Sequence, residues 1–220
     1  MGPSSDPMAA DQGPDRDHGP VGAEATPAKG DQLTKSQAAR RERVIRAAIE
    51  LAAAGGYDAV QMRDVAAHGQ VALGTIYRYF TSKDHLLAAA QVEWVTDLER
   101  RVAQRPPRGD TTALRMVEIL HRATRAMERE PALTAALVTA MSSPDSGVAH
   151  CQREMGVVMG RIQALAFPDD FDQITERRII DALEFIWFSS LLAWANGWVA
   201  IGDAGERLAS AAHLLLDQYD

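Results

Sequence analysis

The chain has 220 residues, of which 46% are hydrophobic and 24% charged, as is usual for a globular protein with a core of its own. A single cysteine, Cys151, excludes an internal disulfide and a multi-cysteine metal site and favours a reducing cytoplasm; no apolar run reaches the ~18–20 residues of a membrane span. The net charge of -7 is unevenly spread, since residues 33–83 carry eight basic and four acidic side chains whereas residues 106–220 carry ten and sixteen.

Residues 1–35 are predicted to form a disordered tail, because the first 32 are rich in Gly, Pro, Asp and Ala and have almost no large apolar side chain to bury. From Ser36 the pattern becomes helical, with apolar residues recurring at spacings of three and four. The pair Gly55-Gly56 predicts the end of this helix, since glycine is common just past a helix C-terminus.

The segment 61–83 is the most informative part of the chain. Its pattern predicts a helix over about 62–68, a turn at Gly69 and a short helix over about 73–79. Two short helices around a turn, with hydroxyls and positive charges on the second, are typical of a helix-turn-helix unit whose second helix enters the major groove. Residues 36–83 are therefore predicted to bind DNA, with an arbitrary helical hairpin as the alternative.

The side chains of this segment divide into those suited to contact DNA and those suited to hold its helices together. Arg63 favours bidentate contact with guanine, Gly74 allows the backbone to come close, and Lys83 is placed for a phosphate. The predicted DNA contacts are Gln61, Arg63, Gly74, Thr75, Tyr77, Tyr79 and Lys83. The predicted small core consists of Val65, Ala66, Val71, Ile76 and Phe80.

A long fourth helix is predicted to begin after Thr81 or Ser82, where Thr81-Ser82-Lys83-Asp84 fits a capping box. It should end at Arg105-Pro106-Pro107, because proline cannot continue a helix. Further helical patterns cover residues 113–129, 131–141, 148–167, 174–198 and 204–218. No strand-like alternation of any length is present, so the fold is predicted to be all-α, with 84–220 as its second domain.

The segment 185–194 is apolar almost all round. Such a helix is expected to be buried. In an acidic protein of this size, burying so much apolar surface usually requires a partner chain as well as the protein's own core.

The N-terminal pattern resembles the DNA-binding domain of the TetR family of bacterial repressors over about residues 40–90. The stretches that carry the resemblance are Gly55-Gly56-Tyr57, Met62-Arg63-Asp64-Val65-Ala66, Gly74-Thr75-Ile76-Tyr77-Arg78-Tyr79-Phe80 and Ser82-Lys83-Asp84-His85-Leu86-Leu87. The resemblance implies a homodimer that reads palindromic operator DNA with three N-terminal helices. It also implies that residues 84–220 bind a small molecule, dimerise through the last two long helices and shift the fourth helix when the ligand enters.

Three stretches, 56–63, 125–134 and 187–194, are similar in particular to actinobacterial repressors of sterol catabolism within this family. This likeness implies control of sterol or lipid breakdown genes, with a sterol-derived acid or its coenzyme A thioester as the effector. A fatty acyl thioester or a drug-like amphiphile is the alternative effector. A helical lipid carrier or enzyme is the alternative from another functional class.

An apolar effector requires a roomy, mostly apolar pocket with a few polar anchors. Methionine suits its wall, because the thioether chain adapts to ligands of varied shape. The predicted lining is Trp94, Leu98, Met116, Leu120, Leu137, Met141, Met155, Met159, Ile162 and Trp187. Ordinary core packing is the more frequent role for such residues. His121 or Arg125 is a candidate anchor for a carboxylate or thioester, with a solvated helix face as the alternative for each.

Other candidate sites are weak. His150 and Glu154 have the spacing of two metal ligands on one helix face, but no third ligand is evident. Cys151 next to His150 does not make a catalytic pair, since neighbouring residues on a helix point in different directions. Phosphate-binding glycine loops and nucleophile elbows are missing from the sequence. We therefore predict no cofactor, no metal and no catalytic residue.

Overall fold

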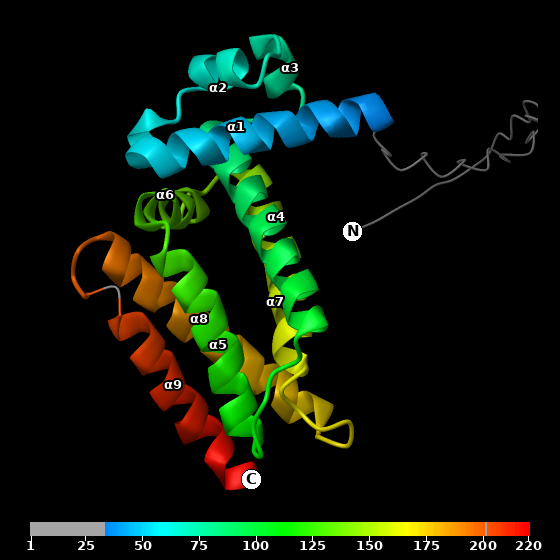
Figure 1. Cartoon of the computed structure of the whole chain (residues 1–220), viewed down its shortest axis with the longest axis vertical. Coiled ribbons are helices and arrows are strands. Elements are labelled where there is room, and N and C mark those ends of the chain that lie inside the picture. Colours follow the sequence, from blue (N-terminus) through cyan, green and yellow to red (C-terminus); the bar gives the residue numbers. More distant parts are fainter. Residues whose placement is uncertain (1–33, 201) are drawn as a thin grey trace, which may run out of the picture. The chain divides into compact units, whose positions relative to one another are not determined.

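The computed structural model describes residues 34–200 and 202–220, and in this part of the chain the only regular elements are helices, as predicted (Figure 1). The predicted disordered tail lies outside the described residues, apart from Thr34 and Lys35, which begin the first helix. The α-helices are α1 (Lys35–Ala59), α2 (Met62–His68), α3 (Leu73–Tyr77), α4 (Lys83–Gln104), α5 (Thr112–Glu128), α6 (Pro131–Met141), α7 (Ser146–Ala164), α8 (Gln173–Ala195) and α9 (Asp203–Leu216). A 3-10 turn, η1 (Asp217–Tyr219), follows α9. None of the described helices is both long and apolar enough to cross a bilayer.

Helix α1 begins and breaks where local chemistry requires. The Thr34 hydroxyl accepts from the Gln37 amide and the Gln37 side chain accepts from the Thr34 amide, which completes a capping box. Near its other end the helix is interrupted at Gly55 and Gly56, and Gly56 has a φ of 72°. Glycine adopts this left-handed conformation without steric cost, so the predicted break is confirmed.

The turn between α2 and α3 confirms the helix-turn-helix expectation. The residue with left-handed backbone in this turn is not its glycine. The residue with positive φ is Gln70, at 52°, whereas Gly69 has a φ of -78°. Gly69 instead allows close packing, because a Cβ there would lie 3.1 Å from the Val65 carbonyl oxygen and 3.5 Å from that of Arg43 on α1. The glycine is thus a contact point between α1 and the turn.

Helices α3 and α4 differ from expectation at their ends. Helix α3 stops at Tyr77 rather than Tyr79, so Tyr79 lies in the connection to α4. The N-cap of α4 is Ser82, whose hydroxyl accepts from the His85 amide at 3.0 Å. The expected Thr81–Asp84 capping box is therefore wrong, since a cap at Ser82 shifts the reciprocal position by one residue to His85.

The later helices confirm the predicted pattern to within a few residues at each end. Helix α6 spans the predicted residues and has Pro131 at its first position, where the missing N–H costs nothing. The Thr111 hydroxyl caps the N-terminus of α5. The carboxylates of Asp145 and Asp172 cap the N-termini of α7 and α8, respectively.

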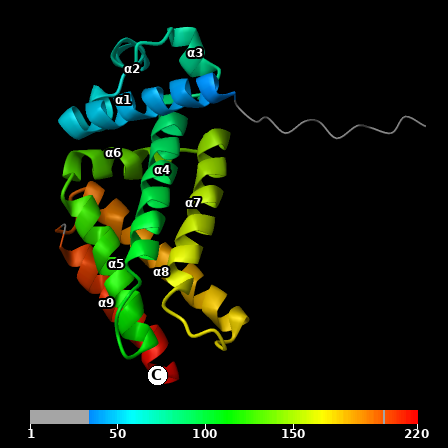
Figure 2. The same cartoon turned by 45° about the vertical axis from the view of Figure 1, so that its right-hand side comes forward.

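The buried apolar residues form two clusters that α4 connects. The first joins α1–α3 to the N-terminal half of α4, to α6 and to the start of α7. The second joins the C-terminal half of α4 to α5, α7, α8 and α9. Figures 1 and 2 show α1 crossing the N-terminal end of α4, with α6 beneath α1, in agreement with the contacts between these helices. We call residues 35–80 the head; its core extends beyond them into α4 and α6.

Phe80 anchors the head to α4. Its side chain is buried, its ring packs edge-on against His85 with centroids 5.5 Å apart, and the guanidinium carbon of Arg41 lies 5.5 Å from its centroid. Val65, Ala66 and Ile76 are buried around it, as predicted, and Val71 is partly buried against the same cluster.

We expect Phe80→Ala to lower the free energy of unfolding by about 3–5 kcal/mol, because it removes a buried ring and leaves a cavity. The exposed Tyr77, three residues earlier, is the control, and Tyr77→Ala should change stability by no more than about 0.5 kcal/mol. Urea unfolding followed by circular dichroism measures both. Equal losses in the two variants would contradict this packing.

Candidate nucleic-acid interface and effector cavity

Helix α3 presents a small polar face to solvent. Tyr77 is 54% exposed, Gly74 is exposed and Thr75 is partly exposed. A Cβ at Gly74 would meet no protein atom within 4 Å, so the fold itself does not require glycine there. The buried Ile76 fixes α3 from the opposite side. A rigid short helix with hydroxyls and bare backbone outward is suited to lie in a major groove.

Two further predicted contacts, Gln61 and Arg63, lie at the start of α2. Both side chains are exposed, and the Gln61 amide donates to the Asp58 carbonyl at 2.9 Å. Gln61 is the N-cap residue of α2 but makes no side-chain capping bond. Arg63 forms no ion pair among the described residues, so its guanidinium is available to an external acceptor.

Tyr79 and Lys83 are oriented more toward the protein than the sequence indicated. Tyr79 is partly buried against the head's core. The Lys83 ammonium lies 3.6 Å from the centroid of the Tyr57 ring and donates to the Tyr57 carbonyl at 3.2 Å. The Tyr57 hydroxyl in turn donates to Asp84 at 2.5 Å, and its pKa is raised to about 12 by burial and by Asp84. Lys83 thus ties the end of α1 to the start of α4, in addition to its predicted role at phosphate.

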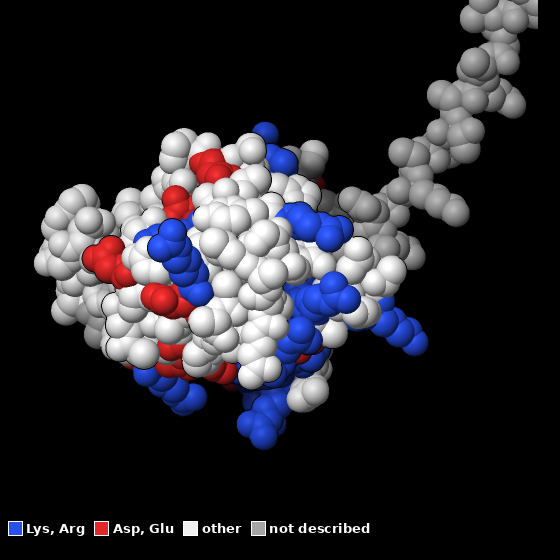
Figure 3. Space-filling view, turned by 90° about the horizontal axis from the view of Figure 1, so that it is seen from above, with Lys and Arg blue, Asp and Glu red and all other residues white. Residues whose placement is uncertain are grey.

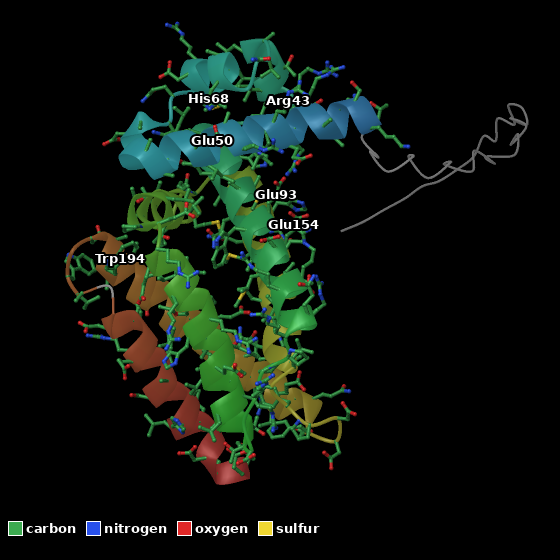
Figure 4. All side chains as sticks on the ribbon, viewed as in Figure 1. Arg43, Glu50, His68, Glu93, Glu154 and Trp194 are labelled. Atoms are coloured by element: carbon green, nitrogen blue, oxygen red, sulfur yellow. The ribbon has the colours of Figure 1, made fainter. Side chains whose placement is uncertain are left out.

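The charges on this end of the protein are unevenly placed. Seen from above, most Lys and Arg atoms lie along the right and lower part of the face, whereas Asp and Glu atoms lie mainly on the left, where a further basic side chain stands among them (Figure 3). His68 on α2 pairs with Glu50 on α1 at 2.5 Å, and these two residues face each other across the helices in Figure 4. The head is therefore net basic, in contrast to the chain as a whole, and it offers a basic side to phosphates.

Polar contacts connect the head to the helices below it. Arg41 on α1 pairs with Glu93 on α4 at 2.9 Å. The Thr81 hydroxyl donates to the carboxylate of Asp145 at 3.1 Å, and the same carboxylate caps α7 by accepting from the Gly147 amide. A movement of α4 or α7 must therefore move or break contacts that hold the head.

An apolar cavity lies between α4, α5, α6, α7 and α8, and we call it the effector cavity. Its lining residues are Gln91, Trp94, Val95, Met127, Leu137, Val138, Met141, Met155, Gly156, Met159, Glu184, Trp187, Phe188 and Leu191. The space open to water-sized molecules is about 70 Å³. That is room for about five waters at the ~10–15 Å³ each requires on this measure. A larger occupant requires side chains to move, and four methionines in the wall are suited to do so.

Six of the ten predicted lining residues are in this wall: Trp94, Leu137, Met141, Met155, Met159 and Trp187. Met116, Leu120 and Ile162 do not line it and are fully buried in the second cluster. Leu98 lies one turn further along α4 and borders a different hollow. The helical pattern identified these four as buried but not which buried side chain faces a void. Met127 lines the cavity although the sequence analysis did not select it.

Three buried polar groups line the cavity, and of these only Trp187 was predicted from the sequence. Oε1 of Gln91, Oε1 of Glu184 and Nε1 of Trp187 are all buried without a hydrogen-bond partner in the described structure. Gln91 and Trp187 are only 6% and 7% exposed. Burial raises the pKa of Glu184 to about 7, with a smaller contribution from Asp181, whereas Arg177 opposes the shift. Glutamate and glutamine at these helix positions give no sequence signal that distinguishes them from solvent-facing residues.

A second hollow, the arginine groove, adjoins the effector cavity between α4 and α5. It is lined by Leu98, Arg101, Val102, Arg105, Arg122, Arg125, Ala126 and Arg129. Arg101 pairs with Asp97, and Arg122 pairs with Glu118. The other three arginines form no ion pair within the described residues. The groove places the predicted anchor Arg125 among four other guanidinium groups.

The remaining candidates do not gain support as sites. His150 pairs with Glu154 at 3.3 Å, and the described residues contain no group of three potential metal ligands. His121 is partly exposed and faces Gly205 of α9. Cys151 is buried, and burial raises its pKa to about 11, which makes the thiolate scarce at neutral pH.

Comparison with known families identifies the architecture. Residues 44–90 match the family described as bacterial regulatory proteins, tetR family, and residues 109–215 match a tetracyclin repressor-like C-terminal domain. The chain belongs to the TetR family. The HTH-type transcriptional repressor KstR of Rhodococcus jostii is 39% identical over 88% of this chain and 91% of its own length. KstR of Mycobacterium tuberculosis is 32% identical over 88% of each chain.

Solved structures agree with this assignment. A TetR regulator from Rhodococcus sp. RHA1 superposes with a TM-score of 0.75 at 30% identity, over 84% of this chain and all of the other. FadR of Thermus thermophilus, a TetR repressor solved with lauroyl-CoA, has a TM-score of 0.60 at 22% identity over 80% of this chain and 92% of its own. The protein is thus a TetR-type transcriptional repressor in family and fold, related to the HTH-type transcriptional repressors called KstR.

The raised pKa of Glu184 predicts a pH-dependent stability. A folded-state pKa of about 7 against an ordinary value of 4.5 means that the folded protein holds a proton that the unfolded chain has lost. The free energy of unfolding should therefore fall as the pH rises through this window. Glu184→Gln removes the titrating group and should raise the melting temperature relative to wild type more at about pH 8 than at about pH 5. Equal shifts at both pH values would contradict the burial of this carboxyl.

Proposed function

We propose that the protein represses transcription as a homodimer bound to a palindromic operator, and that a small hydrophobic effector, derived from a sterol or another lipid, releases it. The observation that carries the proposal is the shared helix α4. Its first turns pack against the head, and two turns after Lys83 the side chains of Gln91, Trp94 and Val95 line the effector cavity. Lys83 and Gln91 are about 12 Å apart along the helix axis.

Effector entry acts on DNA affinity through this helix. A ligand larger than the cavity pushes on Trp94 and Val95, and the displacement reaches the head through the Arg41–Glu93 pair and through the contact of Lys83 with Tyr57 on α1. In a dimer, a small rotation of each head changes the distance between the two reading helices. Half-sites lie one helical turn of DNA apart, so the altered spacing lowers affinity for the operator. The effector thereby shifts the population toward the conformer that does not fit DNA.

The dimer interface is proposed on α8 and α9, which pack side by side in Figures 1 and 2. Phe185 on α8 is 79% exposed and Leu214 on α9 is 83% exposed in the single chain. The sequence analysis expected the helix around Phe185 to be buried, and a partner chain on this face would cover it. Large exposed apolar side chains on two adjacent helices are typical of such an interface.

Phe185→Glu combined with Leu214→Glu should convert the dimer to a monomer, because each charge would be buried in the interface at high cost. Val157→Glu is the control, since Val157 is also an exposed apolar residue but lies on α7. Sedimentation velocity measures the mass. A dimer that survives the double substitution would place the interface elsewhere.

The proposed contacts with DNA predict two different effects of substitution, a loss of base preference and a general loss of affinity. Thr75→Ala should relax preference at particular base pairs, whereas Lys83→Ala should weaken binding on all sequences and reduce its salt dependence. Gel shifts on an operator fragment, on single-base variants and on random DNA at several salt concentrations separate them. Uniform weakening by Thr75→Ala would reject its reading role. Failure of the wild type to prefer operator over random DNA by roughly a thousandfold would reject the repressor itself and favour the helical carrier or enzyme.

The effector is proposed to be a thioester carrying phosphates rather than a free acid. The arginine groove supports this, because its uncompensated guanidinium groups adjoin the effector cavity: Val95 and Leu98 are three residues apart on α4, and Ala126 and Met127 are neighbours on α5. Arg101 lies about 27 Å along α4 from Lys83, which removes the groove from the DNA-reading face. FadR repressors of this fold have been solved with lauroyl-CoA and stearoyl-CoA.

A panel of free acids and coenzyme A thioesters, from sterol side chains and from fatty acids, tests the effector by release of operator DNA in fluorescence anisotropy. Each thioester should release DNA at a concentration at least tenfold lower than its acid, since phosphates engage arginine strongly. Arg125→Ala with Arg129→Ala should remove that advantage, and Arg153→Ala, an exposed arginine on α7, should keep it. An advantage that survives the double substitution would place the phosphates elsewhere.

A further inference from the structure

We propose that the effector cavity recognises an uncharged oxygen, best a hydroxyl, on the deeply buried end of an apolar ligand, with Trp187 as hydrogen-bond donor and Gln91 and Glu184 as acceptors. This inference rests on the proposed effector function and adds to it the chemistry of the ligand's inner end. The residues involved belong to the cavity wall and have no role in the fold that would explain their polarity.

The three groups come from two walls of one space. Gln91 is on α4, whereas Glu184 and Trp187 are on α8, three residues apart and therefore neighbours on one helix face. All three line the same cavity, and apart from the indole N–H of Trp94 and the backbone the rest of its lining is apolar. Opposite Glu184, Gly156 on α7 contributes no side chain, and a Cβ there would lie 3.7 Å from Glu184 Oε2. The wall is thus open beside the carboxyl.

The packing of the cavity wall does not explain why these positions carry polar atoms that lack a hydrogen-bond partner. Nε1 of Trp187, Oε1 of Gln91 and Oε1 of Glu184 are buried and accept or donate no hydrogen bond within the described structure. Buried polar atoms without partners are rare in folded proteins, because each has lost its hydrogen bonds to water. Phenylalanine, leucine or methionine would fill the same positions without that loss. Three such atoms converging on one cavity point to a ligand that pairs with them.

Their donor and acceptor types favour a hydroxyl. The indole N–H of Trp187 can only donate and Oε1 of Gln91 can only accept, whereas the Glu184 carboxyl accepts when ionised and can also donate when it holds its proton. A hydroxyl accepts from Trp187 and donates to one of the two oxygens, which satisfies both kinds of group. A ketone satisfies Trp187 but leaves Gln91 Oε1 unpaired, so it should bind less tightly than the hydroxyl. A hydrocarbon leaves all three unpaired.

An anionic inner end is disfavoured by the charges around the site. Glu184 is itself an acid, and Asp181 lies one turn before it on α8 and raises its pKa. Arg177 is nearby but forms an ion pair with Asp181 at 3.0 Å. A carboxylate placed among these groups would repel Glu184 or force it to hold its proton. The arginine groove lies on the other side of Val95 and Leu98, so an anionic end has a favourable place outside the cavity.

The test compares probes that share one carbon skeleton. Isothermal titration of the full-length dimer with androstane, androstanol, androstanone, an androstane carboxylic acid and an aminoandrostane gives five affinities. The same comparison on a straight chain uses dodecane, dodecanol, dodecanoate and dodecylamine. We expect the alcohol to bind about tenfold more tightly than the hydrocarbon in at least one series, the affinity difference of a satisfied hydrogen bond. In the Arg125→Ala, Arg129→Ala variant, whose arginine groove holds an anionic end less well, the carboxylate should bind more weakly than the alcohol.

Three variants assign the effect to the named groups. Trp187→Phe keeps the aromatic wall and should remove most of the preference for alcohol over hydrocarbon, while leaving the hydrocarbon's affinity unchanged or raised. Glu184→Gln keeps the hydrogen-bonding ability and should preserve the alcohol's affinity while improving the carboxylate's. Met155→Leu, an apolar change in the same wall, should leave every ratio between probes unchanged. Thermal melts confirm that each variant is folded.

The outcomes separate this inference from the proposed function. Binding of the hydrocarbon as tight as that of the alcohol, a carboxylate that binds most tightly in the Arg125→Ala, Arg129→Ala variant, an amine that binds most tightly, or a preference that survives Trp187→Phe would each overturn the inference alone. Absence of binding by every probe in both series would overturn it together with the assignment of the cavity as the effector site. DNA binding by the head would be untouched in either case.

Discussion

The continuous helix α4 is the constraint on which the rest of the protein depends. Its 22 residues form an unbroken hydrogen-bonded rod that extends about 33 Å, with one half in each of the two hydrophobic clusters. Because a helix transmits displacement along its axis without bending easily, a change at the cavity wall cannot remain local. In the proposed mechanism, the contacts that join α4 to the head, Lys83 with Tyr57 and Glu93 with Arg41, determine how much of the movement the head receives.

The body of the protein combines a solid core with a cavity that is not fully packed. Residues such as Met116, Leu120 and Ile162 are completely buried and provide stability. The adjacent cavity instead has four flexible methionines and three unpaired polar atoms. This division is physically reasonable for a regulator, because a site that must open for a ligand cannot also supply the tightest packing. The unpaired polar atoms cost stability in the closed wall, and under the proposed recognition that cost is recovered when a ligand pairs with them.

Much of this organisation could be predicted from the sequence. The helix-turn-helix, the break at Gly55-Gly56 and the later helices follow from periodicity and capping chemistry, and the core residues of the head follow from the same pattern. The errors were local: the capping box expected at Thr81–Asp84, where Ser82 is the cap instead, and the end of α3. Each depends on one or two hydrogen bonds, which a pattern of residue types does not resolve. Lys83 was placed on the correct helix, but its contact with Tyr57 depends on how α1 and α4 pack, because the two residues are 26 positions apart in the sequence.

The sequence by itself determined the all-helical fold, the DNA-reading unit and the family, because these depend on short-range spacing and on residue types at adjacent turns. Only the tertiary structure decided which buried residues face a void and which charged residues converge. Helical periodicity shows that Met116 and Met159 both point inward, yet one fills the core and the other lines the cavity. The arginine groove and the polar set of Gln91, Glu184 and Trp187 unite residues from separate helices. Their proximity arises from how those helices pack, which no local pattern encodes.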